Sequence, residues 1–275
     1  MHPLILQKAV SVTGQGYWGR KSTLTIEPTY SPGFYWRTNH GVTLIRPDIT
    51  AFNFRRLCLS LPPDKLEVIE HLLPLWFTGL TGVLISCTGT WPPYDGSVMP
   101  LWRDVYPHCM KDETRTLPRY TVSEPVSFYY DKVRNGEWAY TCINPSRDGK
   151  LTLNVSIDYP GLGKAHHTLV LPDNTALEEV FAARPQGWPM WAHPIAQTAD
   201  LVRLPHRRNM CWPQDMKSVQ ATLDEFVRHR TLDLLGGLAP LCGDGLFVGV
   251  VNSHCSGHLA DWHAMKKAQH LLVQI

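Results

Sequence analysis

Long apolar runs, paired cysteines and a strong charge of either sign are all missing from this 275-residue chain. No window approaches the roughly 18 consecutive apolar residues of a membrane-spanning helix, so we expect no stable membrane insertion. The opening stretch MHPLILQKAVSVTG is too short and too interrupted for a signal peptide. The formal net charge of +2 offers no electrostatic footprint for nucleic acid or for an anionic membrane, and no nucleic-acid partner is expected.

The seven cysteines are scattered and include no Cys-x-x-Cys pair. Their odd number and their spacing argue against a disulfide framework and against a structural zinc knuckle. A reducing compartment is the simplest setting, so we predict a cytoplasmic protein. Hydrophobic residues make up 44% of the chain and charged residues 18%, a balance that favours a large buried core and argues against global disorder.

The order of predicted elements repeats once along the chain. In the first half, apolar and turn patterns predict strands at 8–12, 22–28 and 41–47, a helix from Asp64 to about residue 78, a strand at 82–88 and a short helix. In the second half they predict strands at 126–130, 137–143, 151–157 and 167–171, helices at 174–183 and about 215–236, a strand at 246–251 and a final helix.

Both halves therefore read as strands, helix, strand, helix, which indicates an α+β protein built from two similar modules. We place the modules at residues 1–112 and 118–275, because the charged, proline-containing segment 110–120 lacks apolar periodicity. Pro74 lies inside the first predicted helix and predicts a kink or an early break there. Asp215, or Thr222 together with Glu225, provides a capping signal for the helix at 215–236.

His229 and Asp233 lie four residues apart in FVRHRTLD and so share one face of that helix. An imidazole and a carboxylate at this spacing can bind one ion. The alternative is an ordinary solvated helix face. The leucines around the pair indicate a buried helix, and a buried charge needs a partner, for which a metal ion qualifies.

Glu70 and His71 are adjacent in VIEHLL, so on a helix their side chains diverge by about 100°. One of them can bind a metal ion while the other reaches a water molecule beside it. We assign His71 as the ligand and Glu70 as the general base. The alternative is a surface glutamate beside a half-buried histidine.

A further imidazole, His258, follows Ser256 and Gly257 at a predicted helix start. It can serve as an acid or stabilise an oxyanion, whereas His254 could compete as a metal ligand and either could be a plain loop histidine. Together these motifs supply three metal ligands, a free carboxylate and a free imidazole, which is the inventory of a catalytic zinc site. The tryptophans of the irregular segment that follows residue 184 are either pocket walls or loop core: Trp188, Trp191 and Trp212.

VIEHLL, PPYDGS, FVRHRTLD and SGH resemble, in order and spacing, the motifs of the LpxC family, as does the opening TGQGYWGRKSTLTIEP. Members of that family are zinc-dependent deacetylases that remove acetate from UDP-3-O-acyl-N-acetylglucosamine in lipid A synthesis. The resemblance implies a two-domain β-α-α-β sandwich with the metal site at the domain interface. It covers nearly the whole chain.

The resemblance also implies roles for individual residues. His71, His229 and Asp233 fall on the family's zinc ligands, Glu70 on its general base and His258 on its general acid or electrostatic partner. The implied reaction is attack of a metal-activated water on an amide carbonyl. Zinc is the expected cofactor, with iron(II) as an alternative because imidazole and carboxylate suit several divalent ions.

Several positions depart from the family pattern. Pro185 replaces a threonine that helps to hold the oxyanion, and Gly237 replaces an aspartate behind the catalytic histidine. Arg230 replaces a lysine, and Cys255 replaces a basic residue expected near the nucleotide diphosphate. The family's insert that shapes the acyl-chain tunnel is not recognisable in residues 187–214. We predict substrate contacts from seven residues: Leu57, Cys58, Tyr159, Arg184, Trp188, Arg230 and Cys255.

These departures favour a divergent paralogue that hydrolyses the N-acyl bond of a small or peptide-like molecule, for example in specialised metabolism. One alternative is a genuine lipid A deacetylase, in which Lys164, Arg203, Arg207 and Arg208 replace the lost diphosphate contacts. The other is a non-catalytic ligand-binding protein that keeps the fold. The preserved Glu70, which no structural role demands, argues against that reading. The oligomeric state is left open.

Overall fold

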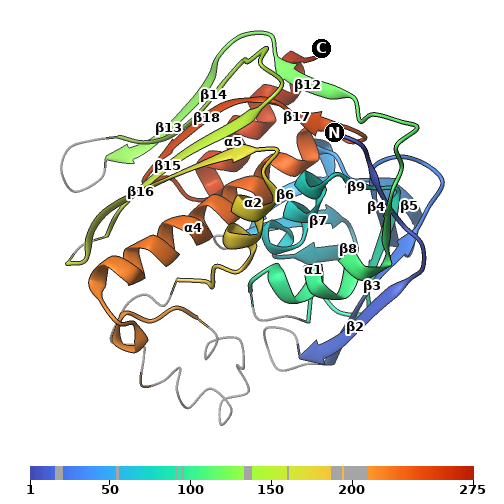
Figure 1. Ribbon diagram of the computed structural model, residues 1–275, viewed down its shortest axis with the longest axis horizontal. Helices are drawn as coiled ribbons and strands as arrows, with labels where there is room; N and C mark the ends of the chain where they lie inside the picture. Colours follow the sequence, from blue (N-terminus) through green and yellow to red (C-terminus); the bar gives the residue numbers. More distant parts are fainter. Residues whose placement is uncertain are drawn as a thin grey trace.

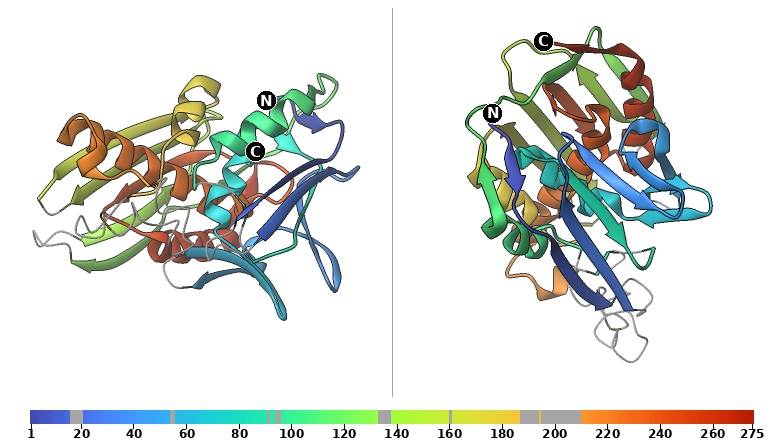
Figure 2. Two further views of the ribbon diagram at one scale, coloured as in Figure 1. Left: turned by 90° about the horizontal axis from the view of Figure 1, so that it is seen from below. Right: turned by 90° about the vertical axis from the view of Figure 1, so that its right-hand side faces the viewer.

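Strands contain more residues than helices in the structure, a computed structural model that describes residues 1–15, 21–53, 56–90, 92–93, 96–132, 138–159, 161–186, 194 and 210–275. Figures 1 and 2 show two strand-rich modules at opposite ends of the molecule, with helices between them. The fold is α+β, as the sequence predicts. Among the described residues, no helix is long and apolar enough to cross a membrane.

The first module is built on a five-stranded sheet with the order β2-β3-β10-β4-β5. Its strands are β2 (Val10–Gln15), β3 (Lys21–Pro28), β4 (Phe34–Thr38), β5 (Gly41–Leu44) and β10 (Val83–Cys87). β10 lies in the centre, antiparallel to β3 and parallel to β4. A three-stranded sheet joins β1 (Leu4–Leu6) to β11 (Cys109–Lys111) and β9 (Leu80–Thr81).

The second module repeats this topology with the order β13-β14-β18-β15-β16. Its strands are β13 (Val126–Lys132), β14 (Trp138–Asn144), β15 (Leu151–Tyr159), β16 (Gly163–Leu171) and β18 (Gly249–His254). The central β18 is antiparallel to β14 and parallel to β15. A second three-stranded sheet joins β12 (Arg119–Val122) to β17 (Leu246–Phe247) and β19 (Leu272–Gln274).

Strand order and direction therefore match between the modules, which confirms the duplication predicted from element order. The helix after each central strand is also equivalent: α1 (Met99–Val105) follows β10, and α5 (His258–Ala268) follows β18. The predicted division between residues 112 and 118 lies between β11 and β12 and stays a prediction. Other short helices of the described residues include α2 (Asn174–Phe181), η1 (Pro47–Ile49), η4 (Tyr106–His108), η7 (Pro213–Asp215), η8 (Ala239–Leu241) and η9 (Gln269–Leu271).

The helix predicted from Asp64 to about residue 78 is wrong. Asp64–Glu67 is strand β8 of a small antiparallel sheet with β6 (Thr50–Asn53) and β7 (Arg56–Leu61). Two 3-10 segments follow, η2 (Ile69–His71) and η3 (Leu73–Thr78). Val68, with φ at 60°, breaks the chain direction before η2, and Pro74 lies in the first turn of η3. The apolar residues of this segment have helical spacing because the segment is buried on all sides. A 3-10 segment that is buried on all sides can show the same spacing as a buried α-helix.

The long helix of the second module, α4 (Val219–Leu238), lies along the middle of the molecule (Figure 1). Ser218 caps it by accepting a hydrogen bond from the Ala221 N–H, so neither of the predicted capping signals is used. From Phe226 to its end every residue is buried except Arg228. This helix packs on η2 of the first module, on β16 and on α5, so both modules meet along it.

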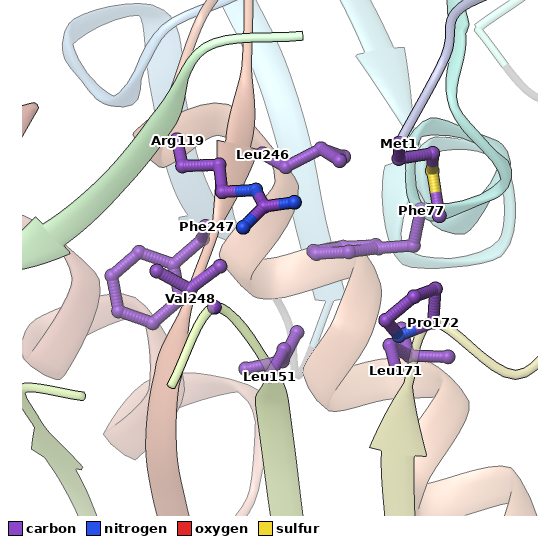
Figure 3. Close-up of a pocket in the computed structure, with 10 residues that line it drawn as sticks. Met1, Phe77, Arg119, Leu151, Leu171, Pro172, Leu246, Phe247 and Val248 are labelled. Atoms are coloured by element: carbon purple, nitrogen blue, oxygen red, sulfur yellow. The ribbon is translucent and has the colours of Figure 1, made fainter. Parts of the chain in front are cut away.

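A small cavity of about 40 Å³ also lies between the modules, lined by Phe77 of η3 and by Arg119, Phe247 and Val248 (Figure 3). That volume suits one or two water molecules rather than a substrate. None of the sequence-predicted site residues lines it.

Candidate metal centre

The crossing of η2 and α4 places the two sequence motifs side by side. Gly236 makes the close approach possible, because a Cβ at that position would lie 2.4 Å from both the Cα and the carbonyl oxygen of Glu70. A glycine is therefore required where the helix passes over the turn. Asp233 lies one turn and His229 two turns before it along α4, and both face the same crossing, so residues more than 150 positions apart meet.

Three side chains with metal-binding atoms converge there: His71, His229 and Asp233, whose ligand atoms all lie within 4.8 Å of one another. The Nε2 atoms of His71 and His229 lie 3.2 and 3.5 Å from Oδ1 of Asp233. Two atoms each about 2.1 Å from one ion at the tetrahedral angle would be about 3.4 Å apart. The spacing and the donor set therefore fit a single divalent ion such as zinc.

His229 is oriented by the backbone, because its Nδ1 lies 3.0 Å from the carbonyl oxygen of Ala183. That carbonyl can only accept, so Nδ1 carries the proton and the Nε2 lone pair faces Asp233. Burial lowers the pKa of His229 to about 4. The imidazole is thus neutral at pH 7, the form that binds metal ions.

Asp233 lies opposite three imidazoles. Burial alone would raise its pKa, but His229, His258 and His71 together hold the pKa well below its usual range. The carboxylate is therefore ionised although only 7% of the residue is exposed. A buried, ionised carboxylate beside imidazole nitrogens is an arrangement that favours a bound cation.

Glu70 is 1% exposed and lies beside this cluster. Its Oε2 accepts a hydrogen bond from the Leu57 N–H at 3.2 Å, and its Oε1 lies 3.6 Å from Nε2 of His258. Burial raises the pKa of this carboxyl group. A raised pKa and one oxygen left toward the cluster suit a group that exchanges protons.

His258 is the first residue of α5, as the sequence predicts. Its Nε2 faces both Glu70 and Oδ2 of Asp233, the latter at 3.8 Å. Within the described residues, its buried Nδ1 has no hydrogen-bond partner. Gly237 supplies no carboxylate there; a Cβ at that position would instead meet Leu57 and Asp261 at 3.3 and 3.6 Å. His258 therefore lacks an orienting carboxylate on Nδ1, as expected from the sequence.

A cavity of about 650 Å³ opens beside the cluster and contains Asp233 and His258 in its wall. Three residues predicted to contact substrate also line it: Tyr159, Arg230 and Cys255. Phe52, Ile157 and Leu259 add apolar surface, and Gln186 adds an amide. A mixed wall of this size accommodates a substrate with polar and apolar parts.

The other predicted contact residues lie elsewhere or outside the described residues. Leu57 contributes its N–H to Glu70, while Cys58 is buried and donates to the Ala51 carbonyl, with a pKa raised by burial to about 11. Arg184 is bound to Glu225. Trp188 lies outside the described residues. None of the three described here lines the cavity, and their predicted roles stay predictions.

Two buried carboxylates near the site had no role in the sequence-based site. Asp261 pairs with Arg230, and Glu225 pairs with Arg184. Their spacing from the motif histidines could have indicated them. Glu225 precedes His229 by four residues and Asp261 follows His258 by three, so each lies one turn away on the same helix face.

Three side chains that could hold a metal ion, with a buried carboxyl group and a further imidazole beside them at the wall of a cavity, form the kind of site that mononuclear metal-dependent hydrolases use. The family model for UDP-3-O-acyl N-acetylglycosamine deacetylase, LpxC, matches residues 5–269. The chain therefore belongs to the LpxC family.

Individual relatives are distant but cover most of the chain. UDP-3-O-acyl-N-acetylglucosamine deacetylase of Syntrophus aciditrophicus is 25% identical over 87% of this chain and 77% of its own length. The proteins of the same name from Geotalea uraniireducens and Neisseria meningitidis are 25% and 26% identical, each over 92% of this chain and over 83% and 85% of their own lengths.

Proposed function

We propose that this chain is a metal-dependent deacylase, with zinc as its ion, that removes the N-acetyl group from an acylated glucosamine nucleotide of the kind named for its relatives. Family membership over residues 5–269 favours this substrate over the unrelated small molecule expected from the sequence departures. The observation that carries the reaction type is the placement of Glu70 and His258 beside the three-ligand cluster.

His71, His229 and Asp233 would hold the ion. A divalent ion in such a site polarises a carbonyl group and lowers the pKa of a water molecule. The chain's own groups do the rest. Glu70, held by the Leu57 N–H, takes a proton from the attacking water and delivers it to the departing amine. His258 Nε2 faces the same space and stabilises the negative charge that develops on the carbonyl oxygen.

The first test is an assay on the zinc-loaded protein with a UDP-3-O-acyl-N-acetylglucosamine, followed by mass spectrometry of the product. Loss of the acetyl group at a rate above that of Glu70→Gln would support the proposal. Absence of turnover from a protein that contains zinc would contradict this choice of substrate.

A second candidate substrate, a neutral N-acyl compound, is favoured by the state of Arg230. This buried guanidinium donates to Asp261, and also to the carbonyl and hydroxyl oxygens of Ser256, each at 3.0 Å. Asp261 offsets the positive charge that a diphosphate would use. Turnover of uncharged N-acyl amides with no activity on the nucleotide would establish this alternative.

A further inference from the structure

The peptide group between Ala183 and Arg184 is held at both ends by α4. Its carbonyl oxygen accepts the hydrogen bond from Nδ1 of His229, and its N–H donates to Oε1 of Glu225 at 3.2 Å. Glu225 and His229 are four residues apart, so they project from the same face of the helix. The two ends of one trans peptide point in opposite directions, which matches the spacing of one helical turn.

The Arg184 side chain adds to this hold on the same carboxylate. Its Nε donates to Oε1 of Glu225 at 2.7 Å, and its Nη2 donates to Oε2 at 3.0 Å. Glu225 thus receives a two-pronged guanidinium contact and a backbone N–H from a single residue, which fixes the peptide plane more firmly than one bond would. The Glu225 side chain is 12% exposed, so water competes little for these bonds.

Neighbouring contacts fix the rest of the segment against α4. The Cys211 N–H donates to the Pro185 carbonyl at 2.7 Å, and the Gln186 amide donates to the Phe226 carbonyl at 3.2 Å. Pro185 also packs on Gly96, where any Cβ would lie 2.3 Å from its ring. The chain from Ala183 to Gln186 therefore runs along the helix in one defined position.

We propose that Glu225 and Arg184 are positioning residues for the metal centre, acting on His229 through the Ala183–Arg184 peptide. This inference rests on the proposed function, since it assigns His229 as a metal ligand. By fixing the carbonyl that receives Nδ1–H, the pair keeps Nε2 unprotonated and directed at the ion. The negative charge on the N–H end of the peptide also makes its carbonyl a stronger acceptor. Groups that orient a ligating histidine in this way typically change metal affinity 10–100-fold when removed.

The experiment compares Glu225→Ala and Glu225→Gln with Asp224→Ala. Asp224 is the adjacent residue on α4; it accepts a hydrogen bond from Gln220 on the exposed side and does not contact His229. Zinc affinity is measured by competition with a chromophoric chelator. We expect at least a 10-fold loss of affinity in Glu225→Ala, a smaller loss in Glu225→Gln, whose amide oxygen can still accept the Arg184 N–H, and no change in Asp224→Ala.

A second readout reports on the imidazole itself. In ¹⁵N-histidine-labelled, metal-free protein, long-range ¹H–¹⁵N spectra distinguish a protonated Nδ1 from a protonated Nε2. The His229 signals should show a single tautomer in the wild type and a mixture in Glu225→Gln. If Glu225→Ala fails to fold, Glu225→Gln carries the test alone.

Wild-type affinity and a single tautomer in Glu225→Gln, or equal losses in the Glu225 and Asp224 variants, would overturn the positioning role. Failure of the wild type to bind zinc would instead contradict the proposed function.

Discussion

Burial determines what each polar side chain of the site can do. Asp233 and Glu70 are both nearly inaccessible to water, whereas burial lowers the pKa of His229, so that its imidazole brings no positive charge at neutral pH. Arg230 is paired with Asp261 and so is largely neutralised. Two carboxyl groups lie in this buried site, and a divalent ion held by His71, His229 and Asp233 would supply positive charge beside them.

Replacing Glu70 by glutamine tests its role as the general base. Glutamine keeps the size of the side chain and can still accept the Leu57 N–H, but it cannot take a proton. We expect turnover to fall by about 10²–10⁴-fold. Zinc content should stay the same, because Glu70 is not one of the three ligands. Turnover within a few-fold of the wild type would contradict the assignment.

At the scale of elements, the site depends on how closely α4 passes over η2. Gly236→Ala places a methyl group against the backbone of Glu70, which has no flexible side chain to move aside. We expect a loss of about 1–3 kcal/mol in the free energy of unfolding despite the higher helix propensity of alanine. Urea denaturation of the metal-free proteins measures it.

Gly237→Ala is the matched control for this change. Its Cβ would meet only side-chain atoms, Cδ1 of Leu57 and Cβ of Asp261, at 3.3 and 3.6 Å. A small adjustment of the leucine accommodates it. Equal effects of the two substitutions would show that close packing on Glu70 is not what makes Gly236 necessary.

The contact between β16 and α4 has its own pH dependence. Nδ1 of His167 lies 3.0 Å from the Thr231 hydroxyl oxygen, and that hydroxyl donates to the Val227 carbonyl, so Nδ1–H is the donor. Burial lowers the pKa of His167 below its unfolded value. The unfolded chain therefore binds more protons as the pH falls below about 6.5, and stability is lost in that direction.

We expect His167→Gln to reduce the difference in unfolding free energy between pH 7.5 and pH 5.5, as measured by urea denaturation at each pH. His166→Gln, which changes the exposed neighbour on the other face of the strand, controls for the loss of one imidazole. An unchanged pH dependence in His167→Gln would show that the β16–α4 contact does not discriminate between the two protonation states.

Strands whose apolar residues alternate with a period of two, or that are flanked by turn residues, could be predicted from the sequence. Most strands of the two five-stranded sheets were predicted in this way. The exceptions have physical causes. β4 and the β6–β8 sheet had no matching prediction, and the segment from Leu66 to Trp76 mimics helical spacing because it is buried on every side. The capping residue Ser218 lies between the two predicted signals, since Asp215 precedes the helix and Thr222 and Glu225 lie inside it.

For the whole molecule, the duplicated topology explains why the centre lies between the modules. The η2–η3 segment and α4 each precede the equivalent short strands β9 and β17, so the two halves contribute equivalent elements to one crossing. The three residues that could hold a metal ion, His71, His229 and Asp233, were predictable because the motifs carry them. The pairing of Glu225 with Arg184 and of Asp261 with Arg230 was not predictable, because pairing between distant segments depends on tertiary packing.

A site shared by both modules couples metal binding to the stability of the folded chain. Free zinc at about 1,000 times its dissociation constant should raise the free energy of unfolding by about 4 kcal/mol. Thermal melts with zinc and with a chelator should therefore differ for the wild type. The two melts should coincide for His229→Ala. A zinc-dependent rise of equal size in that variant would locate the binding site elsewhere.

The metal content of the purified protein most directly tests whether His71, His229 and Asp233 form a metal centre. Elemental mass spectrometry should find about one zinc or iron ion per chain, and none in His229→Ala. A wild-type protein that contains no metal, and takes up none when zinc is added after chelation, would contradict the account and point to a binding protein that has kept only the fold.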